Sequence, residues 1–99
     1  MDINIHSIHF DADKKLIDFT NNKVKKLIQF YDNIINAEVF LRIEKDQNTE
    51  NKLAEIRLDI PGSDIFAKKK SKSFEESIDN CVEAIKRQLT KVKEKQRGV

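Results

Sequence analysis

Residues 37–60 read AEVFLRIEKDQNTENKLAEIRLDI, and this stretch decides the fold. On each side of the polar loop DQNTEN, apolar residues recur at every second position, first at 37, 39, 41 and 43 and then at 54, 56, 58 and 60. Such alternation is typical of strands with one buried face, and a short polar loop between two such runs is typical of an antiparallel hairpin. We therefore predict two paired strands whose apolar faces both point into the core.

Two further strands are predicted beside this hairpin. Pro61-Gly62-Ser63 is a turn, with proline suited to its first central position and glycine to its second. The segment from Asp64 to Lys72 predicts a fourth strand that ends in lysines, as strands on an exposed sheet edge often do. Residues 1–9 (MDINIHSIH) alternate between apolar and polar and predict a half-buried first strand.

The remaining segments have the apolar spacing of amphipathic helices. In the last one, Ser73 and Glu76 form a capping box before apolar residues at positions 74, 78, 82, 85, 89 and 92. The first covers residues 14 to about 31 after Asp13 as its N-cap, with apolar residues at 16, 19, 24, 27, 30 and 31. Lys23 lies inside that apolar stripe, so we expect its stem to cover the core and its ammonium to reach water.

The order of these elements, strand, helix, three strands and helix, predicts an α+β fold. A right-handed helical crossover makes the first strand parallel to the second, and the other strands form an antiparallel meander, so the four-stranded sheet is mixed. Both helices must bury their apolar stripes, most simply side by side on one face of the sheet. A chain of 99 residues has room for a single domain, residues 1–99.

Composition narrows the class of protein. Hydrophobic residues make up 38% of the chain and charged residues 36%, which with this patterning indicates a polar globule and not a disordered chain. No run approaches the roughly 18 apolar residues of a membrane span, and no charged and then apolar leader opens the sequence. One cysteine excludes an internal disulfide framework and a zinc cluster. We expect a cytoplasmic protein with no membrane partner.

No group of residues in the sequence predicts catalysis, a metal site or a cofactor. His6 and His9 lie near the end of the first strand without a third ligand, and Cys81 lies at the margin of an apolar stripe as a small hydrophobe. Gly62 is a turn glycine outside any phosphate-binding loop. Outward carboxylates of the strands are expected to pair across the sheet with arginines, namely Glu44, Glu55 and Asp59 with Arg42 and Arg57.

Cations gather in two places although the net charge is only +2. One is the lysine run Lys68, Lys69, Lys70 and Lys72. The other is the last helix, with Arg87, Lys91 and Lys95 in one row and Lys86, Lys93 and Arg97 in a second. Each pair of like charges at i, i+4 lowers the stability of a helix by roughly a few tenths of a kcal/mol. The helix dipole offsets this cost only in the last turn. A phosphate backbone would explain both rows, so we predict RNA or DNA as partner, with a solvated, solubilising face as the alternative.

Four segments carry a family resemblance. The longest is residues 77–95, SIDNCVEAIKRQLTKVKEK, and the others are the opening MDINI, residues 16–32 and LRIEK at 41–45. In their order and spacing they resemble the ribosome hibernation-promoting factors and ribosome-associated inhibitors of bacteria. The resemblance extends over almost the whole chain and implies a fold related to double-stranded RNA-binding domains.

The resemblance also implies a function. Such a protein is no enzyme; it occupies the channel of the small ribosomal subunit used by mRNA and by A- and P-site tRNAs, contacts rRNA and ribosomal proteins, and inhibits translation under stress or in stationary phase. We expect it to compete with mRNA and tRNA and to be a monomer when free. The basic positions that match those of the family are Lys23, Lys26, Arg42, Arg87, Lys91, Lys93 and Lys95, and Lys86 is basic where family members vary.

Three features depart from the family pattern. The last helix begins Ser73-Phe74-Glu75 where family members carry an acidic residue followed by Met-Tyr. The run from Lys68 to Lys72 is more basic than usual and either extends the RNA footprint or protects the sheet edge. The chain ends at Val99 without the dimerisation domain of long family members, which indicates a short form. Two other readings stay open, an RNA-binding or assembly module of another purpose and a protein-interaction regulator of an alternative sigma factor.

Overall fold

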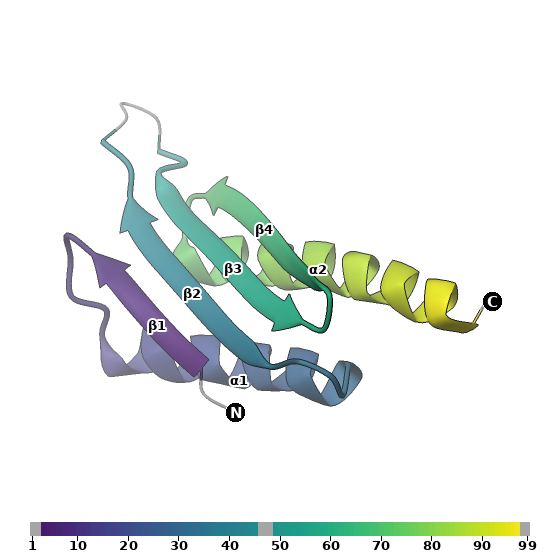
Figure 1. Cartoon of the computed structure of the whole chain (residues 1–99). Helices are drawn as coiled ribbons and strands as arrows, with labels where there is room; N and C mark the ends of the chain where they lie inside the picture. Colours follow the sequence, from purple (N-terminus) through teal and green to yellow (C-terminus); the bar gives the residue numbers. More distant parts are fainter. Residues whose placement is uncertain (1–2, 46–48, 98–99) are drawn as a thin grey trace.

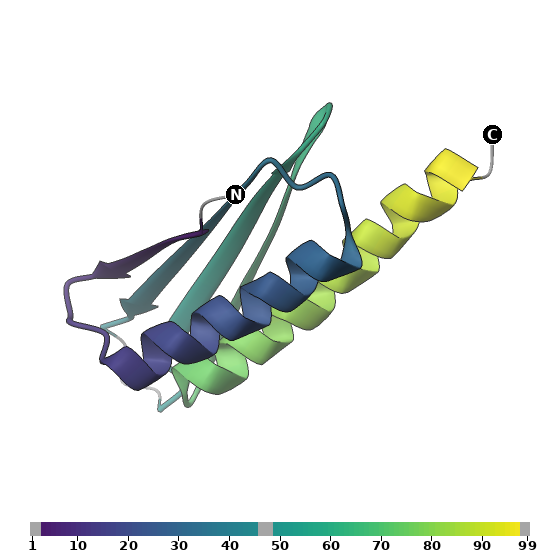
Figure 2. The same ribbon diagram turned by 90° about the horizontal axis from the view of Figure 1, so that it is seen from below.

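A four-stranded sheet carries both helices on one of its faces (Figures 1 and 2). The computed structural model describes residues 3–45 and 49–97. In chain order the elements are β1 (Ile3–Ile8), α1 (Lys14–Phe30), β2 (Asn36–Ile43), β3 (Lys52–Ile60), β4 (Ser63–Ser71) and α2 (Phe74–Arg97). The strands lie in the order β1-β2-β3-β4, with β1 parallel to β2 and the other pairs antiparallel. The predicted α+β fold with a mixed sheet is confirmed.

The core lies between the sheet and the two helices because the alternating residues of the strands meet in register. Val39 pairs with Ile56, which in turn pairs with Ala67, so one row of apolar side chains crosses the sheet toward the helices. The helices close this layer with fully buried apolar side chains, which are Val24 and Leu27 from α1 and Ile78, Cys81, Ile85 and Leu89 from α2. The predicted apolar stripes of both helices therefore face the same core.

Both helices begin where their predicted caps stand. Asp13 Oδ1 accepts the backbone N–H of Leu16 at 2.9 Å, and Ser73 Oγ accepts that of Glu76 at 3.1 Å. Each contact satisfies one of the amide groups that a helix start leaves without an intrahelical acceptor. Residue 31 is the C-cap of α1, with extended backbone, so this helix ends one residue before its predicted end.

Short departures from the predicted strand bounds follow from the turns. Gly62 adopts φ +81°, as the second central position of the predicted turn requires, and pairing resumes at once between Ile60 and Ser63. β4 therefore begins and ends one residue earlier than predicted. Residues 1–2 of the predicted first strand and residues 46–48 of the predicted loop lie outside the described residues.

Cys81 lies in the centre of the core and not at its margin. Its Sγ donates a hydrogen bond to the carbonyl oxygen of Ala54 at 3.2 Å, and the carbonyl oxygen of Ala67 lies at 3.6 Å. The small side chains of these two alanines let α2 approach the sheet closely at this point. Burial raises the pKa of the Cys81 thiol to about 11, so at neutral pH the residue is a protonated, apolar packing group, as its residue type predicted.

Candidate nucleic-acid interface

The two helices run side by side in the same direction (Figure 2). We call their outer surface the helix layer, and most of the predicted cations belong to these two helices. Two contacts define how the helices meet. Lys23 Nζ lies 2.9 Å from Asp79 Oδ1, and Lys93 Nζ lies 4.1 Å from the centroid of the Phe30 ring. The line where α1 and α2 meet, which we call the seam, is therefore bordered by charged and aromatic side chains of both helices.

Lys23 has protein partners in this structure. Its side chain is 30% exposed, lies with Nζ 5.4 Å from the centroid of the Phe19 ring, and makes an ion pair with Asp79 of α2. The ammonium was predicted to reach water and instead meets a carboxylate of the neighbouring helix. A partly exposed pair of this kind contributes about 0–1 kcal/mol, so Lys23 can exchange Asp79 for a phosphate at small cost. Its role in RNA binding stays a prediction.

Lys26 and Lys95 extend the helix layer beyond these contacts. Lys26 is exposed and lies one turn from both Lys23 and Phe30, so it shares their side of α1. Lys95 is exposed one turn beyond Lys91, on the part of α2 that continues past the end of α1 (Figure 2). The side chain of Arg97 lies outside the described part of the structure.

A groove of about 480 Å³ lies beside the end of α1, which we call the Phe30 groove. Its cations come from α2, and two carboxylates and one aromatic ring complete it. The lining residues are Phe30, Glu83, Lys86, Arg87, Thr90, Lys91 and Glu94. From the sequence, Phe30 was assigned to the core alone. Its position four residues after Lys26 and seven after Lys23 puts it on their side of α1, and this spacing could have indicated that it also borders the seam.

The other predicted cations lie on the sheet and not on the helix layer. Arg42 is exposed on the outer sheet face, the face away from the helices, because its neighbour Leu41 points into the core. Lys68 and Lys70 alternate with the buried Ala67 and Ser71 and share that outer face, whereas Lys69 alternates to the helix side and remains exposed, as does Lys72 just after β4. The fold thus places Lys23, Lys26, Lys86, Arg87, Lys91, Lys93 and Lys95 on the two helices and separates Arg42 and most of the lysine run from them.

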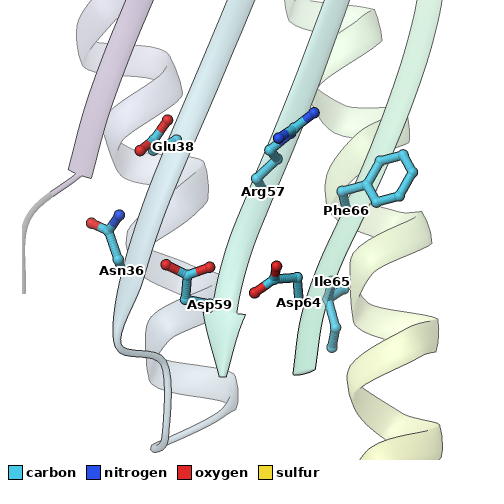
Figure 3. A pocket seen from close by; sticks show the side chains of 7 residues that line it. All are labelled: Asn36, Glu38, Arg57, Asp59, Asp64, Ile65 and Phe66. Atoms are coloured by element: carbon cyan, nitrogen blue, oxygen red, sulfur yellow. The ribbon is translucent and has the colours of Figure 1, made fainter. Parts of the chain in front are cut away.

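The outer sheet face also holds a pocket of about 370 Å³ whose charge is unsuited to phosphate (Figure 3). Asp59 and Asp64 lie beside one another on β3 and β4, and Glu38 is a third carboxylate in its lining. A hydrogen bond with Asp64, together with burial and the charges of Asp64 and Glu38, raises the pKa of Asp59. Three carboxylates outnumber the one cation of the lining, Arg57, so this end of the sheet is a poor candidate for an interface with an RNA backbone.

The predicted ion pairs across the strands are wrong in their geometry. Arg57 Nε donates to Glu55 Oε2 at 3.0 Å, which is a contact along β3 and not across the sheet. The register places Leu53 opposite Arg42, and Asp59 meets Asp64 in place of an arginine. Strand alternation predicts the face of a residue correctly but leaves open which neighbour on that face its side chain meets.

His6 joins the outer sheet face. The His6 ring stacks on the Phe40 ring with centroids 4.8 Å apart, and its Nε2 lies 3.8 Å from Glu38 Oε2. Among the described residues, no three or more His, Cys, Asp and Glu side chains come together as a metal site would need. Within the same residues, neither helix combines the length and the apolar character needed to cross a membrane.

The fold and the cation-bordered seam define a small α+β binding domain. The chain belongs to the family described as "Sigma 54 modulation protein / S30EA ribosomal protein", whose sequence profile matches residues 3–97. It is 30% identical over 99 residues to the ribosome hibernation promoting factor of Pseudomonas putida, which covers 100% of this chain and 93% of that protein. The factor of Escherichia coli K12 is 30% identical over 95 residues, 96% of each chain. The resemblance seen in the sequence is confirmed.

Solved structures have the same fold. A ribosomal subunit interface protein from Coxiella burnetii superposes with a TM-score of 0.82 at 25% identity, over 94% of this chain and 98% of the other. The N-terminal domain of Thermus thermophilus Protein Y gives a TM-score of 0.78 at 20% identity, over 93% of this chain and 99% of that domain. This second likeness shows the fold alone.

Proposed function

We propose that this chain is a ribosome hibernation factor. It binds the small ribosomal subunit in the channel used by mRNA and by A- and P-site tRNAs, and it inhibits translation there under stress or in stationary phase. Family membership and the names of the relatives support a ribosomal role. The observation that carries the proposal from this structure is the placing of cations on the helix layer, with Lys23 and Lys93 at the seam and three more around the Phe30 groove, on the side of the molecule opposite the carboxylate pocket.

The proposed mechanism is occupancy without catalysis. Lysine and arginine side chains of the helix layer pair with rRNA phosphates, and the body of the domain fills space that mRNA and tRNA need. The protein acts as a cytoplasmic monomer when free and contacts rRNA and ribosomal proteins without a cofactor. Arg42, Lys68, Lys69, Lys70 and Lys72 would touch RNA only if the channel wall also reaches the sheet.

Competition tests this mechanism. An occupant of the A and P sites and this protein must weaken each other's binding by the same factor, because linkage between two ligands is reciprocal. Labelled protein is titrated onto purified small subunits, first vacant and then saturated with mRNA and P-site tRNA. We expect the affinity to fall when both ligands are present, and saturating mRNA with initiator tRNA to relieve inhibition of translation. An unchanged affinity for filled subunits would refute occlusion.

Rival functions predict different outcomes in a simple fractionation. An RNA-processing or assembly module would bind structured RNA away from mature ribosomes, whereas a hibernation factor sediments with ribosomal particles. The family description also names sigma 54 modulation, which would need a protein complex that survives ribonuclease. Sucrose-gradient profiles of cells with and without this chain, before and after ribonuclease, separate the three.

A further inference from the structure

The Phe30 groove combines features that phosphate binding alone does not require. Phe30 is half-buried, and Lys93 Nζ lies over its ring at 4.1 Å from the centroid. Lys93 covers one face of this ring, and Phe30 also lines the groove of about 480 Å³, so a base in the groove must stack on the other ring face or displace the ammonium. That volume lies within the range of about 300–1,000 Å³ typical of sites for small organic ligands.

The groove has charged side chains of both signs, all of them on α2. Lys86, Arg87 and Lys91 supply cations suited to a sugar-phosphate backbone. Glu83 and Glu94 also line the groove, and their carboxylates would repel a phosphate that entered it fully. Carboxylate oxygens do, however, accept hydrogen bonds from the exocyclic amino groups and ring N–H groups of nucleobases. A ligand that carries both an anionic backbone and a flat, N–H-bearing ring fits this arrangement.

We infer that the Phe30 groove holds one unpaired nucleobase of the bound RNA, stacked on the Phe30 ring, with the neighbouring phosphates on Arg87 and Lys91. This inference rests on the proposed RNA-binding function and specifies it: the RNA at the seam is single-stranded at this point and not a continuous duplex. Stacking on an aromatic side chain is how proteins hold splayed bases, and every base has a face that suits it.

Stacking and phosphate contact separate in a salt titration, because counterion release depends on the phosphates and not on the bases. The probe is a short single-stranded RNA of mixed sequence, bound by the full chain over a series of salt concentrations. For Phe30→Leu we expect binding about 5- to 150-fold weaker at every salt concentration, with the slope of log K against log salt unchanged. For Lys91→Gln we expect the magnitude of the slope to fall by about 0.7.

Two variants control for the fold and for exposed aromatic rings. Phe30→Tyr keeps a stacking ring and should bind like the native protein. Phe66→Leu removes a ring that is 57% exposed on the outer sheet face and should leave binding unchanged. Thermal unfolding of each variant identifies any that loses the fold. If Phe30→Leu does not fold, the affinities of Phe30→Tyr for an intact probe and for a probe with a single abasic position are compared instead.

Several results would overturn the inference. These are a folded Phe30→Leu variant with native affinity, native-like affinity for an abasic probe, a preference for duplex RNA over the single strand, or no binding of the native protein to the probe at low salt. The ribosome competition experiment is independent of these outcomes. It can succeed while the groove proves empty, and it can fail while the groove still binds a base.

Discussion

Lys23 and Lys93 both reach the seam, yet each meets a different kind of partner. Lys23 lies against the Asp79 carboxylate at 2.9 Å, whereas Lys93 lies over the Phe30 ring. An ion pair neutralises the cation, but an aromatic ring leaves its charge available to a phosphate beside it. We therefore expect Lys93 to bind a phosphate without first losing an ion pair, whereas Lys23 must exchange Asp79 for it.

Asp59 gives a pH-dependent prediction at the same scale. Its pKa is raised in the folded protein, chiefly by the hydrogen bond with Asp64, so the native state binds this proton more tightly than the unfolded chain does. The contribution to stability is complete below the ordinary pKa of 3.8 and is lost as the pH rises through the raised native value. Once Asp59 has lost its proton, this hydrogen bond is lost and the charges of Asp64 and Glu38 oppose the ionised carboxylate.

We therefore expect Asp59→Asn to raise the urea midpoint at pH 7 and to raise it less as the pH falls toward 3.8. Urea unfolding followed by circular dichroism over a pH series measures this. Asp64→Asn is the matched variant, and the double substitution should add little to either single one because all three remove the same repulsion. A midpoint that falls at pH 7, or a gain that is constant with pH, would contradict this account of the pair.

Helix α2 serves the core and the candidate interface with opposite sides. Ile85 and Leu89 are fully buried, while Arg87 and Lys91 on the same helix are exposed beside the Phe30 groove. Its start is held by the Ser73 cap, and Gln88 Nε2 donates to the carbonyl oxygen of Phe66 at 2.9 Å, which attaches the helix to β4. Substitutions on the buried side of α2 should therefore change stability, and substitutions on its exposed side should change binding.

Substitutions on the two sides of α2 should separate stability from binding. Leu89→Ala should lower the free energy of unfolding by about 2–5 kcal/mol, because it removes buried methyl groups and leaves a cavity. Arg87→Glu with Lys91→Glu should keep the fold and weaken binding to small subunits. Urea unfolding and subunit binding are measured for each variant.

An equal charge reversal on the other side of the molecule is the control for that pair. Arg42→Glu with Lys68→Glu changes the outer sheet face by the same charge and should weaken subunit binding less. Equal losses would extend the interface to the sheet. Unfolding of the Arg87 and Lys91 variant would mean that these cations are structural and that the helix layer is wrongly assigned.

The whole molecule has two surface regions of different charge. Cations outnumber carboxylates around the Phe30 groove of the helix layer, whereas three carboxylates and a single arginine line the pocket at one end of the outer sheet face (Figure 3). A charge separation of this kind orients a protein as it approaches a polyanion, with the cationic side first. The net charge of +2 conceals this, because it adds the two surfaces together.

Salt dependence is the prediction that belongs to the whole surface. If about five or six phosphates are neutralised, log K for small-subunit binding should fall with log salt at a slope of roughly −3.5 to −5.5, between the single-strand and duplex coefficients. Binding is measured from low to moderate potassium chloride at constant magnesium, so that the subunits stay intact. A slope near zero would remove phosphate contact as the source of affinity.

The sequence by itself determined the elements and their order. Caps at Asp13 and Ser73, the turn at Gly62 and the alternation around residues 37–60 act through groups only a few positions apart, so local chemistry suffices to predict them. The right-handed crossover then leaves one arrangement of β1 beside β2. Family membership followed from the same segments.

Only the tertiary structure decided which side chains meet. The contacts of Lys23 with Asp79, of Lys93 with Phe30 and of Asp59 with Asp64 join segments that the sequence treats separately. The two contacts between the helices depend on how far α2 is rotated and shifted along the sheet, on which it packs through Cys81. Asp59 and Asp64 meet through the register of β3 and β4. Periodicity gives the buried face of a helix, but its position along a neighbour follows from the fit of many side chains at once.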